Sequence, residues 1–335
     1  MKKAMFWEEK EGNKVKCYLC PHNCLISEGN RGLCNVRENK NGTLYSLVYG
    51  KAASLAVDPI EKKPLFHFHP GTQVLSYGTM GCNLSCNFCQ NASLSCGNPE
   101  SSYLKERLAK DIVEQTVQYD GVAWTYNEPT ISYEFSYDVF KKLKADHDKY
   151  TVYVTNGYIE DEPLEKIIPY LDAMNIDIKA FNEEFYKNIV GGELEPVLDT
   201  ARTAVENDVH VEVTYLIIPG HNDSKDELQR FSRWVKENLG EDNVLHFSRF
   251  HPDHEMRDTP ATSPDKMREA REIAHNTGLN FVYLGNMRAD NDTRCPNCDN
   301  TILSRSYFSS GRLDLEKGKC PDCGRDIPIV THSTV

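Results

Sequence analysis

The sequence predicts an α/β fold built on a parallel sheet, with one small cysteine-rich module before it and another after it. Between residues 73 and 286, apolar runs typical of strands alternate with segments of helical periodicity. This alternation is typical of parallel strands joined by right-handed helical crossovers. Of the 12 cysteines, all but Cys96 fall into three clusters, which lie before, within and after this region.

The individual elements follow from composition and periodicity. Strands are predicted at 73–79, 121–126, 151–156, 174–180, 210–218, 244–250 and 281–286. Helices are predicted at 104–119, 131–147, 194–208, 225–239 and 263–278. Ser263 and Pro264 begin the last helix, and Gly278 ends it. Because eight strand–helix units occupy roughly 250 residues in a complete barrel, this region holds about six or seven. That number fits an incomplete barrel or a doubly wound sheet.

Composition excludes several classes of protein. The 335 residues carry 50 acidic and 38 basic side chains, so the chain lacks the basic surface expected for nucleic-acid binding. The apolar runs are well short of the roughly 20 residues of a membrane span. Charges also occupy the N-terminal positions where a signal peptide has its apolar core. We therefore expect a cytoplasmic protein without nucleic-acid or membrane partners. In that reducing compartment, clustered thiols are interpreted first as metal ligands.

The central cysteines Cys82, Cys86 and Cys89 have the spacing C-x3-C-x2-C directly after the first predicted strand. A 4Fe-4S cluster normally takes four thiolates, so three protein ligands leave one iron open for another ligand. Catalytic metal sites keep such an open position. In a parallel barrel, the residues that follow the strands share one rim, where catalytic groups lie. A chance trio or a zinc knuckle is the alternative interpretation.

The C-terminal cysteines form the knuckles CPNC and CPDCG, at Cys295, Cys298, Cys320 and Cys323. Their spacing predicts a zinc ribbon with closed tetrahedral coordination, which would fold a tail too small for its own core. Rubredoxin-like iron for electron delivery uses the same ligands and is the alternative.

The N-terminal cysteines form a quartet at Cys17, Cys20, Cys24 and Cys34. Zinc would make this quartet a structural clamp, whereas a second 4Fe-4S cluster would make it an electron relay. The spacing does not decide between them. Cys96 is interpreted as a buried or idle thiol.

The central signature, with an aromatic residue before its last cysteine, resembles that of radical S-adenosylmethionine (SAM) enzymes. Further motifs extend the resemblance over essentially the whole chain: LCPHNC, GLCNVREN, DPIEKKPLFHFHPG, YNEPT, TNGY, DIKAF, IIPGHND, HFSRFHPD and GLNFVYLGN. Together they are similar to the radical enzyme of the AmmeMemoRadiSam system, a relative of pyruvate formate-lyase activating enzymes. The resemblance implies a metal-binding module and linker over residues 1–70, a partial (β/α)6-type TIM barrel over 71–290 and a zinc ribbon over 291–335.

The resemblance also implies a reaction. SAM would bind the open iron, and reduction would cleave it to a 5'-deoxyadenosyl radical that abstracts hydrogen from a substrate. A low-potential reductant is therefore expected. Relatives that activate glycyl-radical enzymes attack a backbone glycine of a partner protein, and Memo-type and AMMECR1-type proteins are candidate partners by analogy. The alternative is a non-enzymatic iron–sulfur and zinc protein for electron transfer or scaffolding.

Cofactor-binding roles are implied for residues that follow the predicted strands. Phe88 would lie near the adenine, and Pro219 would belong to a second adenine-side wall. Glu128 of YNEP would hold the amino group of SAM, the alternative being a surface acid before a turn proline. Thr155 and Asn156 resemble a ribose-side element.

Asp177 and Lys179 alternate on a predicted strand and therefore point to one face. Two charges directed into a barrel must pair with each other or bind a ligand. The histidines are expected to form hydrogen bonds at the rim and not to bind zinc, at His67, His69, His221, His251 and His254.

Overall fold

An eight-stranded sheet forms the centre of the computed structural model, which describes residues 1–331. The strands lie in the order β8 (Ser54–Pro59), β9 (Gln73–Gly78), β11 (Gly121–Trp124), β12 (Tyr150–Thr155), β13 (Ala173–Asp177), β14 (His210–Ile217), β15 (Val244–Arg249) and β16 (Phe281–Gly285). The strands from β9 to β16 are all parallel, and β8 pairs antiparallel with β9. The seven predicted strands are thereby confirmed.

The sheet is open, as a partial barrel is, because within residues 1–331 its edge strands β8 and β16 do not pair with each other and no barrel closes. It has seven parallel strands, where the expected (β/α)6-type TIM barrel has six. The antiparallel strand β8 comes from the segment before residue 70, for which a linker was expected. Its alternating pattern is weak because Ala56 and Val57 are exposed at the edge of the sheet.

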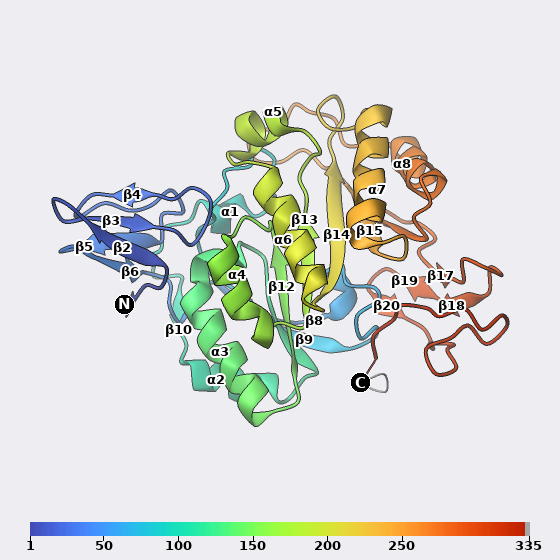
Figure 1. Ribbon diagram of the computed structural model, residues 1–335, viewed down its shortest axis with the longest axis horizontal. Coiled ribbons are helices and arrows are strands. Elements are labelled where there is room, and N and C mark those ends of the chain that lie inside the picture. Colours follow the sequence, from blue (N-terminus) through green and yellow to red (C-terminus); the bar gives the residue numbers. More distant parts are fainter. Residues whose placement is uncertain (332–335) are drawn as a thin grey trace.

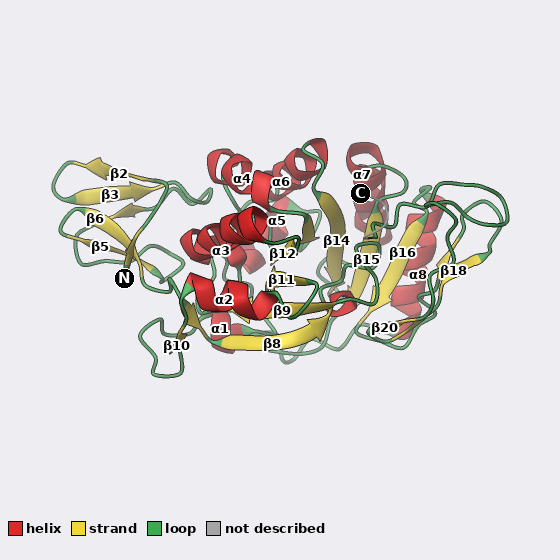
Figure 2. Ribbon diagram, turned by 90° about the horizontal axis from the view of Figure 1, so that it is seen from below, coloured by secondary structure: helices red, strands yellow, loops and turns green. Residues whose placement is uncertain are grey.

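Helices connect the parallel strands. They are α2 (Ala109–Thr116), α3 (Tyr133–Asp146), α4 (Asp161–Ile167), α6 (Glu195–Glu206), α7 (Lys225–Leu239) and α8 (Pro264–Asn276). Figure 2 shows α3, α4, α6 and α7 on one side of the strands. Helix α8 begins as predicted, because the Ser263 hydroxyl accepts a hydrogen bond from the Lys266 amide. None of the helices in residues 1–331 has the length and apolar composition needed to cross a membrane.

Small strands build the two ends of the molecule (Figure 1). The N-terminal strands are β1 (Lys2–Lys3), β2 (Trp7–Lys10), β3 (Lys14–Cys17), β4 (Leu25–Ile26), β5 (Arg37–Lys40) and β6 (Thr43–Ser46), in two sheets of order β2-β3-β4 and β1-β6-β5. Strand β7 (Lys51–Ala52) pairs with β10 (Lys105–Glu106). The C-terminal strands are β17 (Thr293–Arg294), β18 (Thr301–Leu303), β19 (Arg305–Ser306) and β20 (Ser309–Ser310).

A buried ion pair attaches the N-terminal strands to α3. Arg37 and Glu134 are each about 1% exposed and lie in direct contact. The Arg37 guanidinium also donates to the Met5 carbonyl at 2.8 Å, and the Met5 amide donates to Glu134 at 2.8 Å. The orientation of the N-terminal strands is therefore fixed by a charge pair that water does not reach.

Glu212, near the start of β14, fixes the segment that leads into the sheet. Its buried carboxylate accepts hydrogen bonds from the Phe66 and His67 amides and contacts His246 at 2.6 Å. His67 in turn contacts the Tyr283 hydroxyl at 2.7 Å. His67 is therefore hydrogen-bonded as expected, but near the amino ends of the strands and not at the rim.

The C-terminal module covers the same segment. The Arg305 guanidinium donates to the Phe66 carbonyl at 2.6 Å and lies over the Phe66 ring. Val330 forms backbone hydrogen bonds with His67 and His69. The last described residues of the chain thus lie beside residues 66–69, at the amino end of the sheet.

Candidate functional site

The central cysteines lie in the loop between β9 and α1 (Ala92–Ser95). Because β9 to β16 are parallel, the loops that follow these strands share one edge of the sheet. Glu128 follows β11, Thr155 ends β12 and Asp177 ends β13. The candidate site is therefore built where the sequence predicts it, at the carboxyl ends of neighbouring strands.

The sulfurs of the central cysteines are spaced more widely than the ligands of a single zinc ion. A zinc ion with Zn–S bonds of about 2.3 Å holds its thiolates about 3.8 Å apart. Within residues 1–331, the C-terminal cysteines are the one group of three or more metal-ligating side chains whose ligand atoms lie within 4.8 Å of one another. The sulfurs of Cys82, Cys86 and Cys89 are thus not gathered around one point, which is compatible with thiolates on separate irons.

Beside the trio, the sulfur of Cys89 contacts the Ser95 hydroxyl at 3.3 Å. Cys96, the next residue, is exposed and not buried. Burial raises the pKa of Cys86 to about 12, so iron binding has to displace its proton. These three thiols therefore suit a cluster that keeps one iron open.

Asn156 connects the β12 loop to the cysteine loop. Its amide nitrogen donates to the Asn83 side-chain oxygen at 2.9 Å and lies 3.7 Å from the Cys82 sulfur, which also accepts from the Leu84 amide at 3.4 Å. Hydrogen bonds to a ligating sulfur orient it and tune the cluster potential. Sequence reasoning missed Asn83, although its place between the cysteines was a usable signal.

Glu128 is not a surface acid, because it is 3% exposed. One carboxylate oxygen accepts from the Thr130 amide at 2.9 Å and the Thr155 hydroxyl at 2.7 Å, and the other accepts from the Asn156 amide at 2.8 Å. Burial raises the pKa of Glu128 above its ordinary value, and the hydrogen bonds oppose that shift. A carboxylate offers about four acceptor positions, and these three hydrogen bonds occupy three of them. About one position therefore remains for a cationic ligand.

Asp177 and Lys179 form an ion pair, one of the two alternatives predicted for them, with 2.7 Å between the ammonium and the carboxylate. Burial lowers the pKa of Lys179, but Asp177 outweighs it and the net pKa lies above the ordinary value. The Lys179 charge also lowers the pKa of Cys86, against the larger effect of burial. Lys179 therefore brings positive charge toward the cysteine loop and Asp177 partly offsets it, while the partly exposed Asp177 carboxylate can accept further hydrogen bonds.

Aromatic rings lie beside the cysteine loop. Phe88 is buried, with its ring centroid 5.9 Å from that of Phe185, and the Phe185 ring lies 6.4 Å from that of His221. Pro219 lies in the turn after β14, next to the buried Ile218. An adenine-side role for Phe88 and Pro219 stays a prediction.

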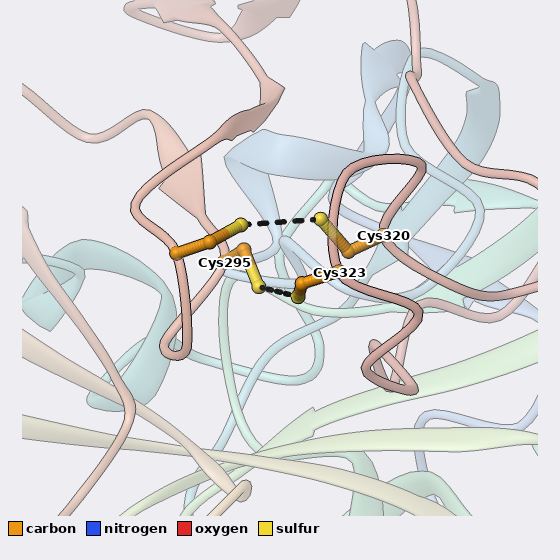
Figure 3. A group of neighbouring side chains, drawn as sticks. Cys295, Cys320 and Cys323 are labelled. Atoms are coloured by element: carbon orange, nitrogen blue, oxygen red, sulfur yellow. Dashed lines mark hydrogen bonds between the residues drawn. The ribbon is translucent and has the colours of Figure 1, made fainter.

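The C-terminal quartet has the spacing of a single-ion site. The Cys295 and Cys323 sulfurs are 3.5 Å apart, and those of Cys298 and Cys320 are 3.6 Å apart. Figure 3 shows Cys295, Cys320 and Cys323 converging on one point. This spacing is close to the value of about 3.8 Å for tetrahedral thiolate coordination.

Comparison with known proteins places the chain in a family. Residues 76–235 match the model of the Radical SAM superfamily. The chain is 46% identical over 336 residues to an uncharacterized protein of Methanocaldococcus jannaschii, covering 98% of this chain and 100% of that protein. The chain therefore belongs to the Radical SAM superfamily and is a radical SAM enzyme. Membership implies a 4Fe-4S cluster and SAM, and the central thiols fit both.

Two more distant similarities are to proteins whose names state an activity or a bound peptide. The chain is 24% identical over 178 residues to the pyruvate formate-lyase 1-activating enzyme of Escherichia coli, covering 50% of this chain and 70% of that enzyme. The crystal structure of Streptococcus suis SuiB bound to its precursor peptide SuiA has a TM-score of 0.51 and 15% identity, covering 68% of this chain and 51% of that chain. The second likeness shows the shared fold.

Proposed function

We propose that this enzyme cleaves SAM reductively at an open-iron cluster on Cys82, Cys86 and Cys89 and abstracts hydrogen from a protein substrate. The cluster and SAM together supply, when bound, a 5'-deoxyadenosyl radical. The observation that carries the proposal is that Asn156 joins the buried carboxylate of Glu128 to the loop of the cysteine trio, because its backbone amide donates to Glu128 and its side chain donates to Asn83. Superfamily membership favours this reaction over non-enzymatic electron transfer or scaffolding.

The surrounding residues position the cofactor. Glu128 would accept a hydrogen bond from the amino group of SAM, because a charged donor next to a carboxylate forms a strong hydrogen bond. Thr155 and Asn156 hold that carboxylate in place, and Asn156 also fixes the cysteine loop through Asn83. Asp177, which is held by its ion pair with Lys179, would accept a hydrogen bond from the ligand.

A protein substrate is supported by the relatives. The Escherichia coli relative activates pyruvate formate-lyase, and SuiB binds a precursor peptide. Activation of a glycyl-radical enzyme is the second candidate function. Memo-type and AMMECR1-type proteins are candidate substrates on the strength of the motif resemblance, and a reducing cytoplasm suits the thiols.

This function is tested under anaerobic conditions. The purified chain is reconstituted with iron and sulfide, reduced with dithionite and supplied with SAM, and 5'-deoxyadenosine is measured by chromatography. Production that is lost in Cys82→Ala and kept in the matched control Cys96→Ala supports the proposal, since Cys96 lies outside the C-x3-C-x2-C signature. A reduced, intact cluster that yields no 5'-deoxyadenosine contradicts it. Transfer of deuterium from a labelled partner protein into 5'-deoxyadenosine would identify the substrate.

Zinc is the metal we propose for the C-terminal quartet, on the basis of the sulfur spacing of 3.5 and 3.6 Å. Elemental analysis of the purified chain should give about one zinc ion, lost in Cys298→Ala. A red, iron-containing quartet in the absence of added zinc would instead support a rubredoxin-like site.

A further inference from the structure

The N-terminal cysteine quartet lines a cavity, unlike the C-terminal one. Its four cysteines lie around a small, partly enclosed space that admits a water-sized sphere. Apolar side chains complete the lining, from Leu19, Ile26 and Ile131. The residues around this space therefore provide sulfur ligands and apolar contacts for a metal centre bound among them.

The two quartets differ in the way expected for two kinds of metal centre. In the C-terminal quartet, the two pairs of neighbouring sulfurs are 3.5 and 3.6 Å apart, and no water-sized sphere fits between the sulfurs of a pair. Within residues 1–331, no three of the N-terminal cysteine sulfurs gather within the 4.8 Å that the C-terminal sulfurs satisfy. A cubic cluster keeps its thiolates on separate irons and therefore needs this wider spacing.

Side chains around the cavity suit a cluster with four thiolates. The buried Arg37 guanidinium lies 3.8 Å from the Cys17 sulfur and brings positive charge to an anionic centre. Gly32 also faces the cavity, and a Cβ there would lie 3.2 Å from Ile26 and 3.7 Å from the Cys24 sulfur. A side chain at this position would therefore press on Ile26 and lie in contact with the Cys24 sulfur.

The cavity adjoins the central cysteine loop. Asn83, the residue after Cys82, lines it, and its carbonyl contacts His22 at 2.6 Å. Gly81 packs so closely that a Cβ there would lie 2.8 Å from the Cys34 carbonyl. The two groups of cysteines are thus joined through directly packed loops.

We propose that Cys17, Cys20, Cys24 and Cys34 bind a second 4Fe-4S cluster, with every iron ligated by the protein, that relays electrons to the central site. One electron from a reduced low-potential iron–sulfur or flavin protein enters at the quartet. The same electron then passes to the central site, so the quartet is reoxidised as the central cluster is reduced. The relay rests on the proposed function, whereas the metal assignment does not.

The metal assignment is tested in the full chain with Cys82, Cys86 and Cys89 all changed to alanine. After anaerobic reconstitution we expect about four iron ions and four sulfides per chain, with a reduced-state EPR signal that SAM does not change. Iron-free protein carrying about two zinc ions would overturn the proposal. If this variant fails to fold, Mössbauer and EPR spectra of the unaltered chain decide: two clusters, of which SAM perturbs one, are expected, and a single cluster refutes the assignment.

The relay is tested by comparing two reductants. In the double variant Cys20→Ala/Cys34→Ala, the rate of 5'-deoxyadenosine formation with a protein donor should fall much more than the rate with dithionite. Dithionite reaches the central site directly and does not need the quartet. An unchanged ratio of the two rates refutes the relay. If the unaltered chain makes no 5'-deoxyadenosine with either reductant, the proposed function fails, while the spectroscopic result on the quartet still stands.

Discussion

Replacing Glu128 by glutamine tests the proposed cofactor contact while keeping the size of the side chain. The variant loses the negative charge that would accept from the amino group of SAM. A hydrogen bond to a charged group contributes about 1.5–3 kcal/mol. At about 1.4 kcal/mol per tenfold change in affinity, SAM should bind roughly 10- to 100-fold more weakly.

The same substitution also affects folding. The glutamine oxygen can still accept from Thr130 and Thr155, but the amide nitrogen would face the Asn156 amide, which is also a donor. A buried donor left without an acceptor costs about 1–3 kcal/mol. Stability therefore has to be measured together with affinity.

Thr155→Val is the matched control, because it removes one donor to the carboxylate at 2.7 Å and leaves the charge in place. SAM affinity is measured by anaerobic equilibrium dialysis on the reconstituted chain, and Tm by calorimetry. We expect both variants to lose stability and the glutamine variant alone to lose most of its affinity. If Glu128→Gln binds SAM as tightly as the unaltered chain while its Tm falls, the carboxylate is only structural and the reasoning is refuted.

The pH dependence provides a second criterion for the same residue. Burial raises the pKa of Glu128, so the carboxylate loses its charge at a higher pH than an ordinary glutamate as the solution is acidified. SAM affinity of the unaltered chain should then fall on the acid side. The glutamine variant should lack this dependence.

Three further outcomes are expected. Arg37→Met should lower the free energy of unfolding by about 3–5 kcal/mol, because it leaves the Glu134 carboxylate buried without its partner. In urea titrations, the double variant Arg37→Met/Glu134→Leu should recover much of that loss. No recovery would contradict the argument. Burial lowers the pKa of His67 to about 3 from 6.5, so stability should fall as the pH drops below about 6.5, where the unfolded chain takes up the proton first. His67→Phe should flatten this slope in urea titrations at pH 7 to 4, whereas the exposed His147→Gln should not. Removing the C-terminal metal with a chelator should lower Tm, and re-addition of zinc should restore it; an unchanged Tm would exclude a stabilising metal there.

The central sheet could be predicted because its strands are buried on both faces and its helices have one apolar face. Both leave a periodic signal in the sequence. Helix α4 was missed because its seven residues include Pro163 and contain too few turns to show a period. Strand β8 was missed because it lies at an edge, where exposed apolar residues break the alternation.

The part of the candidate site whose residues lie at the ends of the parallel strands could be predicted from the sequence. Glu128, Thr155 and Asn156 are brought together by parallel neighbouring strands, so their meeting follows from the order of the elements. Contacts between distant segments leave no such signal. Glu212 binds the Phe66 amide across 146 positions, and nothing in either local sequence indicates the other.

The attachment of Val330 and Arg305 to residues 66–69 has a consequence for biosynthesis. Domains begin to fold from the N-terminus while the ribosome is still adding residues. Here Phe66 and Phe281 share a hydrophobic cluster with Ile302 and Ile329, which are translated after them. A nascent chain that stops before the C-terminal module leaves this side of the two aromatic rings uncovered, so this end of the sheet completes its core only after that module has been synthesised.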